Sequence, residues 1–191
     1  MKLLLASNSP RRRDLLTSLG YNFEVISVDC EEIYPKDLSI EKIAEYLSNL
    51  KADAFGTLKK NEVLITADTI VAVGAEILGK PEDALHAKEM LRKLSGKTHQ
   101  VYTGITIRNS KQSISKTDVA HVEIDKLTDA EIDFYIENYQ PFDKAGAYGV
   151  QEWFGMAKIN RITGSYYTVM GLPTHMVYTL LKDFERAADK T

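Results

Sequence analysis

The sequence has 191 residues, of which 44% are hydrophobic and 27% charged, and its formal net charge is −3. This composition supports a real hydrophobic core in a single domain, and the acidic balance argues against a general nucleic-acid-binding or acidic-membrane-binding surface. The one cysteine, Cys30, excludes an intramolecular disulfide and fits a reducing cytoplasm. No apolar run approaches the roughly 18 residues of a membrane span.

The N-terminal segment predicts a strand followed by a helix with an unusual charge. An apolar run at 3–5 precedes Ser9, which suits the N-cap with its hydroxyl accepting a backbone N–H, and Pro10, which suits the first helical position. Arg11, Arg12 and Arg13 then occupy a first turn where the helix dipole disfavours cations. An anion bound by these guanidiniums and free N–H groups would explain them. The alternative is a solvated basic turn on an ordinary helix.

The rest of the chain alternates between strand-like and helix-like segments. We expect Tyr46 and Leu85 on the inward faces of their helices, and an antiparallel pair formed by the strands at 101–108 and 113–124. Thr128 and Glu131 predict a capping box. The expected order is strand 23–28, helix 39–56, strand 63–73, helix 81–94, strands 101–108 and 113–124, helix 128–139, strand 156–162 and a helix from 172 to about 184 with a frayed tail after about 185. This alternation predicts an α/β fold with a mixed sheet.

Asp68 is the second strong signal in the sequence. It lies within the almost unbroken apolar run at 63–73, and an ionised carboxylate buried there is costly unless it is paired, hydrogen-bonded or bound to a metal. One interpretation is that Asp68 faces a cleft, as a metal ligand or as a general base for a water. The other is a structural aspartate satisfied by backbone amides.

Further candidates lie in loops rich in glycine. Lys80 stands between a predicted strand and a helix, and small residues around Lys144 allow a ligand to approach the backbone. Gln151 offers both a donor and an acceptor, which reading a base edge requires. Lys51 and the pair at 31–32 are, taken alone, typical of solvated surface charges. The four histidines have no metal-ligand spacing, so any metal should be a hard cation, Mg²⁺ or Mn²⁺, on carboxylate and phosphate oxygens.

Six motifs in order carry a family resemblance over nearly the whole chain. They occupy residues 6–12, 67–71, 79–81, 98–104, 143–151 and 164–173. With these motifs the chain resembles the Maf family of nucleoside triphosphate pyrophosphatases, also called septum formation inhibitors. The resemblance implies a single Maf-like domain over 1–191, with an elongated mixed sheet flanked by helices and two lobes around a central cleft, as in inosine triphosphate pyrophosphatases. It also implies a homodimer and a divalent metal cation.

The resemblance assigns roles residue by residue. Asp68 matches the catalytic proton acceptor, and Glu32 matches an acid that helps to hold the metal with it, Glu31 being the alternative if the alignment shifts by one. The residues that match the branch acting on dTTP and UTP are Arg11, Thr69 and Gln151. Those that match polar residues lining the nucleotide site are Ser7, Arg12, Lys51, Lys80 and Lys144. Thr168 departs from the family pattern, because an asparagine is common at that position.

The residues and the resemblance agree on one function. We expect hydrolysis of dTTP and UTP, and of modified pyrimidine nucleotides as further candidates, to the monophosphate and pyrophosphate. Two alternatives stay open. One is a nucleotide-binding regulator of cell division without significant turnover, and the other is a pyrophosphatase that removes other noncanonical nucleotides.

Overall fold

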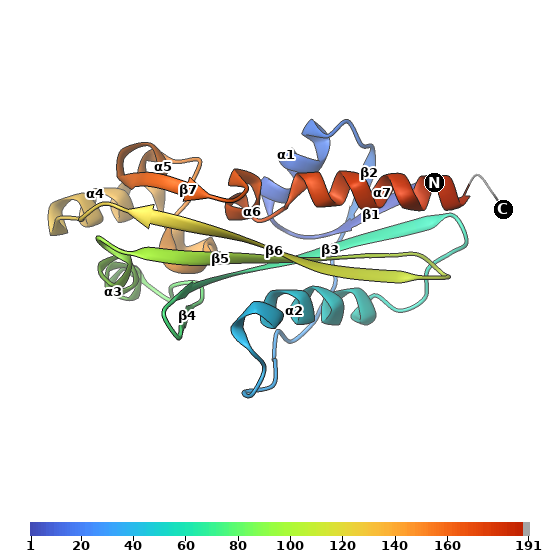
Figure 1. Ribbon diagram of the computed structural model, residues 1–191, viewed down its shortest axis with the longest axis horizontal. Helices are drawn as coiled ribbons and strands as arrows, with labels where there is room; N and C mark the ends of the chain where they lie inside the picture. Colours follow the sequence, from blue (N-terminus) through green and yellow to red (C-terminus); the bar gives the residue numbers. More distant parts are fainter. Residues whose placement is uncertain (189–191) are drawn as a thin grey trace. The chain divides into compact units, whose positions relative to one another are not determined.

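The computed structural model describes residues 1–188 and shows a sheet in the order β2-β1-β3-β5-β6-β7, with β4 paired to β3 (Figure 1). β1 pairs in parallel with β2 and β3, whereas the β3–β4 and β6–β7 pairs are antiparallel. The strands are β1 (Lys2–Ala6), β2 (Phe23–Ile26), β3 (Glu62–Val73), β4 (Glu76–Leu78), β5 (Thr98–Arg108), β6 (Ser113–Ile124) and β7 (Ile159–Thr163). The predicted mixed α/β sheet is therefore confirmed.

Helices flank this sheet, as expected. Within residues 1–188, none of them is both long enough and apolar enough to cross a membrane. They are α1 (Pro10–Ser18), α2 (Ile40–Ala54), α3 (Ala84–Leu94), α4 (Asp129–Tyr139), α5 (Trp153–Lys158), α6 (Tyr166–Met170) and α7 (Thr174–Ala188), with short 3₁₀ turns η1 (Pro141–Asp143) and η2 (Ala145–Ala147).

The chain divides into two compact units. Unit 1 comprises residues 1–68, 103–118 and 171–191, and unit 2 comprises residues 69–102 and 119–170. The long strands β3, β5 and β6 each contribute residues to both units. The expected central cleft between two lobes stays a prediction.

In unit 1, helices cover both faces of the strands: α7 lies on the opposite side from α2 (Figure 1). Leu4 of β1, Ala52 of α2 and Leu64 of β3 share one buried cluster. α2 also approaches β5 very closely at Gly104, where an added Cβ would lie 2.2 Å from the backbone of Ala44. This close approach requires glycine, and it fixes the helix that carries Lys51 against the sheet.

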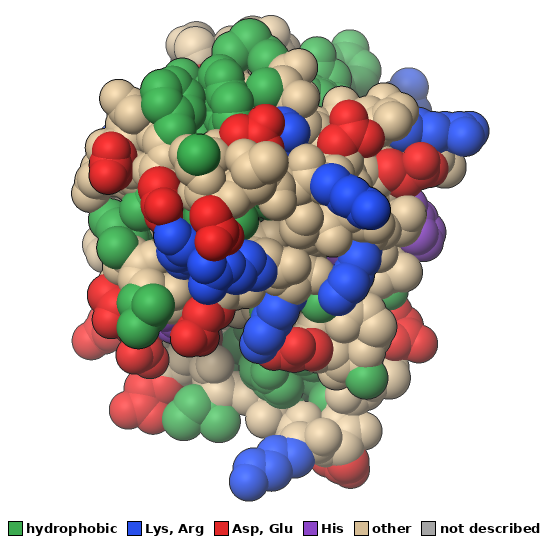
Figure 2. All heavy atoms as spheres, turned by 90° about the vertical axis from the view of Figure 1, so that its left-hand side faces the viewer, with side chains coloured by type: hydrophobic (Ala, Val, Ile, Leu, Met, Phe, Trp, Pro, Cys, Tyr) green, Lys and Arg blue, Asp and Glu red, His purple; other side chains and the backbone are tan. Residues whose placement is uncertain are grey.

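In unit 2, α3, α4 and the segment at 145–154 pack around the far parts of the long strands. The core includes Leu91 of α3, Tyr135 of α4, and Tyr148 and Phe154 of the segment. The capping box of Thr128 and Glu131 is present, as the sequence predicts. Ion pairs join α3 to α4, and Figure 2 shows basic and acidic side chains interspersed on that end of the molecule.

Several local predictions are wrong. Ser9 is the N-cap of α1, but its hydroxyl makes no capping hydrogen bond; its backbone N–H donates instead to Ser7 Oγ. Tyr46 and Leu85 are exposed rather than inward, Leu85 by 66%, because each lies at the margin of its helix's apolar stripe.

The boundaries near the C-terminus also differ from prediction. The strand expected at 156–162 begins only at Ile159, because the preceding residues close α5. The segment between β7 and α7, for which no helix was predicted, contains α6. α7 continues to Ala188, beyond the expected end near 184, and the remaining tail at 189–191 lies outside the described residues.

Candidate active site

The site in unit 1 forms where β1 ends beside β3. The parallel register places Ala6, the last residue of β1, opposite Thr66. Beyond Thr66, β1 no longer pairs with β3, so the buried carbonyl groups of β3 on that side need other hydrogen-bond donors. Arg12 Nη1 supplies one, donating to the carbonyl oxygen of Ala67 at 2.9 Å. Asp68, the next residue, therefore belongs to a stretch of β3 that β1 does not pair.

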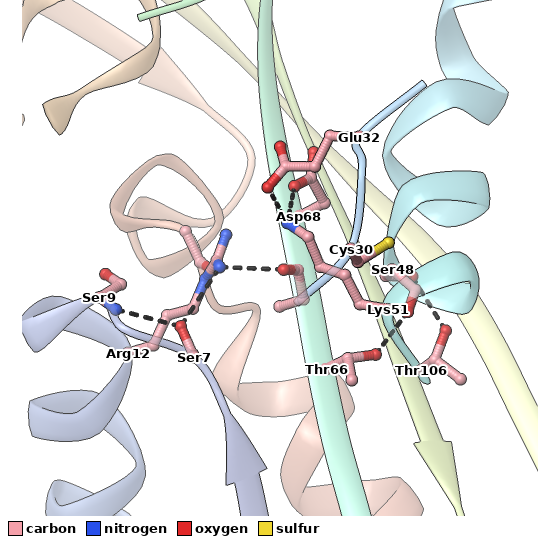
Figure 3. A network of polar contacts seen from close by, with 12 residues as sticks. Ser7, Ser9, Arg12, Cys30, Glu32, Ser48, Lys51, Thr66, Asp68 and Thr106 are labelled. Atoms are coloured by element: carbon pink, nitrogen blue, oxygen red, sulfur yellow. Dashed lines mark hydrogen bonds and ion pairs between the residues drawn. The ribbon is translucent and has the colours of Figure 1, made fainter. Parts of the chain in front are cut away.

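Asp68 is buried and contacts a lysine. Its side chain is 8% exposed, and Oδ1 lies 2.5 Å from Lys51 Nζ. The same ammonium lies 2.9 Å from Glu32 Oε1, whose side chain is half exposed. Figure 3 shows Lys51 reaching both carboxylates. Of the three conditions under which the sequence allows a buried carboxylate here, the structure shows pairing with a cation. The interpretation of Lys51 as a solvated surface charge is wrong.

These surroundings shift the pKa of Asp68 in opposite directions. Burial raises the pKa above its ordinary value, and the Glu32 carboxylate adds to the rise. The cations of Lys51 and Arg12 lower the pKa, but burial prevails. The site thus holds a carboxyl group that takes up a proton more readily than a surface aspartate.

A hydroxyl cluster that the sequence analysis missed sets the position of Lys51. Thr66 Oγ1 donates to the carbonyl oxygen of Ser48 at 2.6 Å, and Ser48 Oγ lies 2.9 Å from Thr106 Oγ1. Thr66 and Asp68 are two residues apart in β3 and so point to the same face, as do Ser48 and Lys51 at a helical spacing of three. The cluster therefore fixes α2 to the sheet beside the acid (Figure 3). The available signal was a serine on the apolar face of α2.

Arg12 joins three segments of unit 1. Its Nε donates to the carbonyl oxygen of Gly171 at 2.8 Å, in addition to the Nη1 bond to Ala67. Ser7 Oγ lies 3.5 Å from Arg12 Nη1 and accepts the Ser9 N–H at 3.2 Å. Burial lowers the pKa of the Arg12 guanidinium below its ordinary value, and the nearby, half-buried Arg11 lowers it further. Asp68 raises this pKa but does not reverse the shift. Part of the cationic first turn is thus explained by contacts within the protein.

The other predicted site residues belong to unit 2. Lys144 is buried, with Nζ 2.7 Å from Asp143 Oδ1 and 3.1 Å from Glu152 Oε1. Lys80 and Gln151 are exposed, and Thr69 is half buried. The loop of Lys80 contacts that of Lys144, because the Gly146 N–H donates to the carbonyl oxygen of Gly79 at 3.0 Å.

Glu32 and Asp68 suit a hard divalent cation. Both acids approach the same ammonium, so their oxygens already converge on one positive charge. Mg²⁺ is commonly held by one or two carboxylates together with substrate phosphates and waters. The described residues contain no group of three or more His, Cys, Asp or Glu side chains that could hold a metal alone. The donor set therefore fits a cation that phosphate oxygens help to bind.

A buried acid among basic side chains, carried on a mixed α/β sheet, is suited to an enzyme that acts on anionic substrates. Residues 2–184 match the family model described as Maf-like protein. The chain belongs to the Maf-like family.

Relatives match over almost their whole lengths. The dTTP/UTP pyrophosphatase of Bacteroides thetaiotaomicron is 49% identical over 95% of this chain and 95% of its own. The proteins of the same name from Porphyromonas gingivalis and Flavobacterium psychrophilum are 48% and 47% identical, over 96% and 94% of this chain and 94% and 93% of their own. Among solved structures, the Staphylococcus aureus Ham1 protein matches with a TM-score of 0.43 and 18% identity, over 65% of this chain and 72% of that one.

Proposed function

We propose that this protein is a nucleoside triphosphate pyrophosphatase that hydrolyses dTTP and UTP to the monophosphate and pyrophosphate. Relatives of that name at 44–49% identity support the reaction and the substrates. The structural observation that carries the proposal is Asp68, a buried carboxyl group with a raised pKa, in contact with Lys51. An acid in this setting is suited to act as a general base near neutral pH.

In the proposed reaction, Asp68 accepts a proton from a water molecule. The water oxygen forms a bond to the α-phosphorus, the bond from that phosphorus to the bridging oxygen breaks, and pyrophosphate leaves with the electron pair. The Lys51 ammonium favours the charged form of Asp68 before the transfer and so offsets part of the effect of burial on its pKa. Arg12 keeps Asp68 in place through its bond to the Ala67 carbonyl.

The cationic side chains would neutralise the triphosphate. We assign this role to Arg11, Lys80 and Lys144, with Ser7 and Thr69 as hydrogen-bonding partners. Charge neutralisation and positioning supply most of the rate enhancement in phosphoryl chemistry. Gln151 is exposed and would pair its amide with the N3–H and a carbonyl of uracil or thymine.

The proposal includes a divalent cation, Mg²⁺ or Mn²⁺, held by Asp68 and Glu32. When bound, such a cation neutralises phosphate charge and polarises phosphoryl oxygens. The convergence of both carboxylates on Lys51 supports this assignment. We further propose that the protein acts in the cytoplasm as a homodimer, which sedimentation at several concentrations would test.

A substrate panel tests the function. Purified protein with Mg²⁺ or Mn²⁺ is given dTTP, UTP, CTP, ATP and GTP, and pyrophosphate and phosphate are measured separately. We expect pyrophosphate from dTTP and UTP, little turnover of purine nucleotides, and loss of turnover with a chelator that added metal restores. Equal rates on ATP, GTP and dTTP would contradict the pyrimidine preference, and phosphate as first product would contradict the reaction. Tight nucleotide binding without turnover would favour the regulatory alternative.

A further inference from the structure

Unit 2 contains a half-buried carboxylate that the proposed reaction does not use. Glu152 follows Gln151 directly, and its side chain is 18% exposed. Its Oε1 lies 3.1 Å from Lys144 Nζ, and its backbone N–H donates to the carbonyl oxygen of Gly149 at 3.2 Å. Glu152 therefore contacts Lys144 and adjoins Gln151, two of the proposed substrate-binding residues.

The hydroxyl group of Tyr135 holds this carboxylate. Tyr135 is a fully buried residue of α4, and its hydroxyl donates a short hydrogen bond to Glu152 Oε2. The Tyr135 hydroxyl oxygen in turn accepts the Gly149 N–H at 2.8 Å. Burial and the Glu152 carboxylate both hold the pKa of Tyr135 well above its ordinary value, so the group remains a protonated donor.

One hydroxyl group thus fixes both ends of the turn at 149–152. Gly149 is held through its N–H and Glu152 through its carboxylate, and Gln151 lies between them. The turn is also tightly packed, since a Cβ added to Gly149 would lie 2.6 Å from Glu152 Cδ. The ring of Tyr135 is itself fixed, with ring centroids of Tyr139 and Phe154 at 5.1 and 5.2 Å.

We infer that Tyr135, acting through Glu152 and the 149–152 turn, is a positioning residue for pyrimidine recognition. The inference rests on the proposed function, in which Gln151 reads the base and Lys144 binds phosphate. An amide that pairs with two groups of a base discriminates only if its backbone is fixed, because a mobile side chain can adapt to another base edge. Tyr135 does not touch the nucleotide; it determines where Gln151 and Lys144 stand.

The test removes the hydroxyl group and keeps the ring. In Tyr135→Phe we expect KM for UTP to rise roughly tenfold, the scale of one lost hydrogen bond, with kcat within about twofold. The preference for UTP over CTP should fall by a similar factor. Tyr139→Phe is the matched control: it removes a hydroxyl from the neighbouring stacked ring, outside the contacts that hold the turn, and should leave both quantities unchanged.

Hydrogen exchange provides a readout without turnover. Exchange of residues 146–152 should speed up in Tyr135→Phe and not in Tyr139→Phe. Glu152→Ala should also speed up this exchange and lower the preference for UTP over CTP, without altering the buried ring. Glu152→Gln keeps an oxygen acceptor and should retain slow exchange and the preference for UTP. Unchanged exchange in Tyr135→Phe and Glu152→Ala, or equal losses on UTP and CTP, would overturn the inference.

The failure of the proposed function would look different. If the wild-type protein released no pyrophosphate from UTP or dTTP, that function would be refuted directly. Equilibrium binding of α,β-imido-UTP and its CTP counterpart to the same variants would then decide the inference. Weaker and less selective binding in Tyr135→Phe, but not in Tyr139→Phe, would support it, and equal binding by both variants would overturn it.

Discussion

Asp68 combines two properties that a surface aspartate does not have. Burial raises its pKa, and the Lys51 ammonium at 2.5 Å keeps the ionised form accessible. Its place in an apolar strand is visible in the sequence. Because an unpaired carboxylate there would be too costly, the sequence also indicates that Asp68 needs a partner. Its partners are not, since Lys51 and Glu32 are separated from it by 17 and 36 positions in the chain and only folding brings them together.

Replacing Asp68 tests its proposed role directly. Asp68→Asn keeps the size of the side chain but removes the proton acceptor and one metal-binding charge. We expect the protein to fold and kcat on UTP to fall roughly 10²-fold or more, the scale of a lost general base. Asp14→Asn, which changes an exposed acid of α1, serves as the control and should keep normal turnover. Normal turnover in a folded Asp68→Asn protein would assign Asp68 to structure alone.

Gln151→Glu tests how the base is read. The carboxylate is similar in size to the amide but only accepts hydrogen bonds, so it would face a base carbonyl with another acceptor. A mismatch of this kind costs a few kcal/mol, and kcat/KM for UTP and dTTP should fall about 10²-fold. CTP, with an amino group at the equivalent edge, should lose less activity or gain some. Proportional losses on UTP and CTP, measured as kcat/KM, would show that Gln151 supports the fold or the phosphates instead.

At the scale of elements, the contact between α2 and β5 holds the helix that bears Lys51 against the sheet. Gly104 permits it, because any side chain there would meet the backbone of Ala44. The sequence predicts both elements from their periodicity, but not that they touch at this glycine. It also misplaced the start of β7, because the residues of α5 are too few to show a helical period.

Gly104→Ala should therefore separate α2 from the sheet. With a Cβ 2.2 Å from the Ala44 backbone, neither element can yield by rotating a side chain. We expect the free energy of unfolding to fall by about 3 kcal/mol or more, at the upper end for overpacking, and kcat to fall because Lys51 moves with α2. Urea unfolding measures the first effect. Gly79→Ala, where an added Cβ meets nothing within 4 Å, should unfold close to the wild-type midpoint; a similar stability for both variants would contradict the close contact.

At the scale of the whole molecule, stability should depend on pH through a buried histidine in unit 2. His99 is fully buried, and its Nε2 lies 2.7 Å from Tyr148 Oη. Burial lowers the pKa of His99 from 6.5 to about 4. Below pH 6.5 the unfolded chain therefore binds a proton that the folded chain resists, and stability declines as the pH falls towards 4.

The expected loss from this group between pH 7 and pH 4 is up to about 3 kcal/mol. Urea unfolding followed by the fluorescence of Trp153, the single tryptophan and a residue of unit 2, would measure it. His99→Gln should be less stable at pH 7, because it loses the packing of the buried ring, but should show a smaller decline with acid. An equal decline in both proteins would mean that other groups cause the acid sensitivity.

The sequence by itself determined the alternation of the main strands and helices, without β4, α5 and α6, and also the α/β class, the family, and Asp68 as the outstanding acid. These follow from patterns that are local along the chain: apolar periodicity, the capping box at Thr128, and a charge within an apolar strand. The family motifs also single out candidate residues in each unit, which no local pattern could do.

Only the tertiary structure decided what those residues contact. Arg12 donates to the Ala67 and Gly171 carbonyls, and Lys51 pairs with Asp68 because hydroxyl groups fix α2 to β3. The hydrogen bond from the Tyr135 hydroxyl group to Glu152, on which the inferred positioning role depends, is likewise visible only in the fold. Such contacts join residues far apart in the sequence, and they form because buried polar groups must find partners wherever the packed chain brings donors and acceptors together.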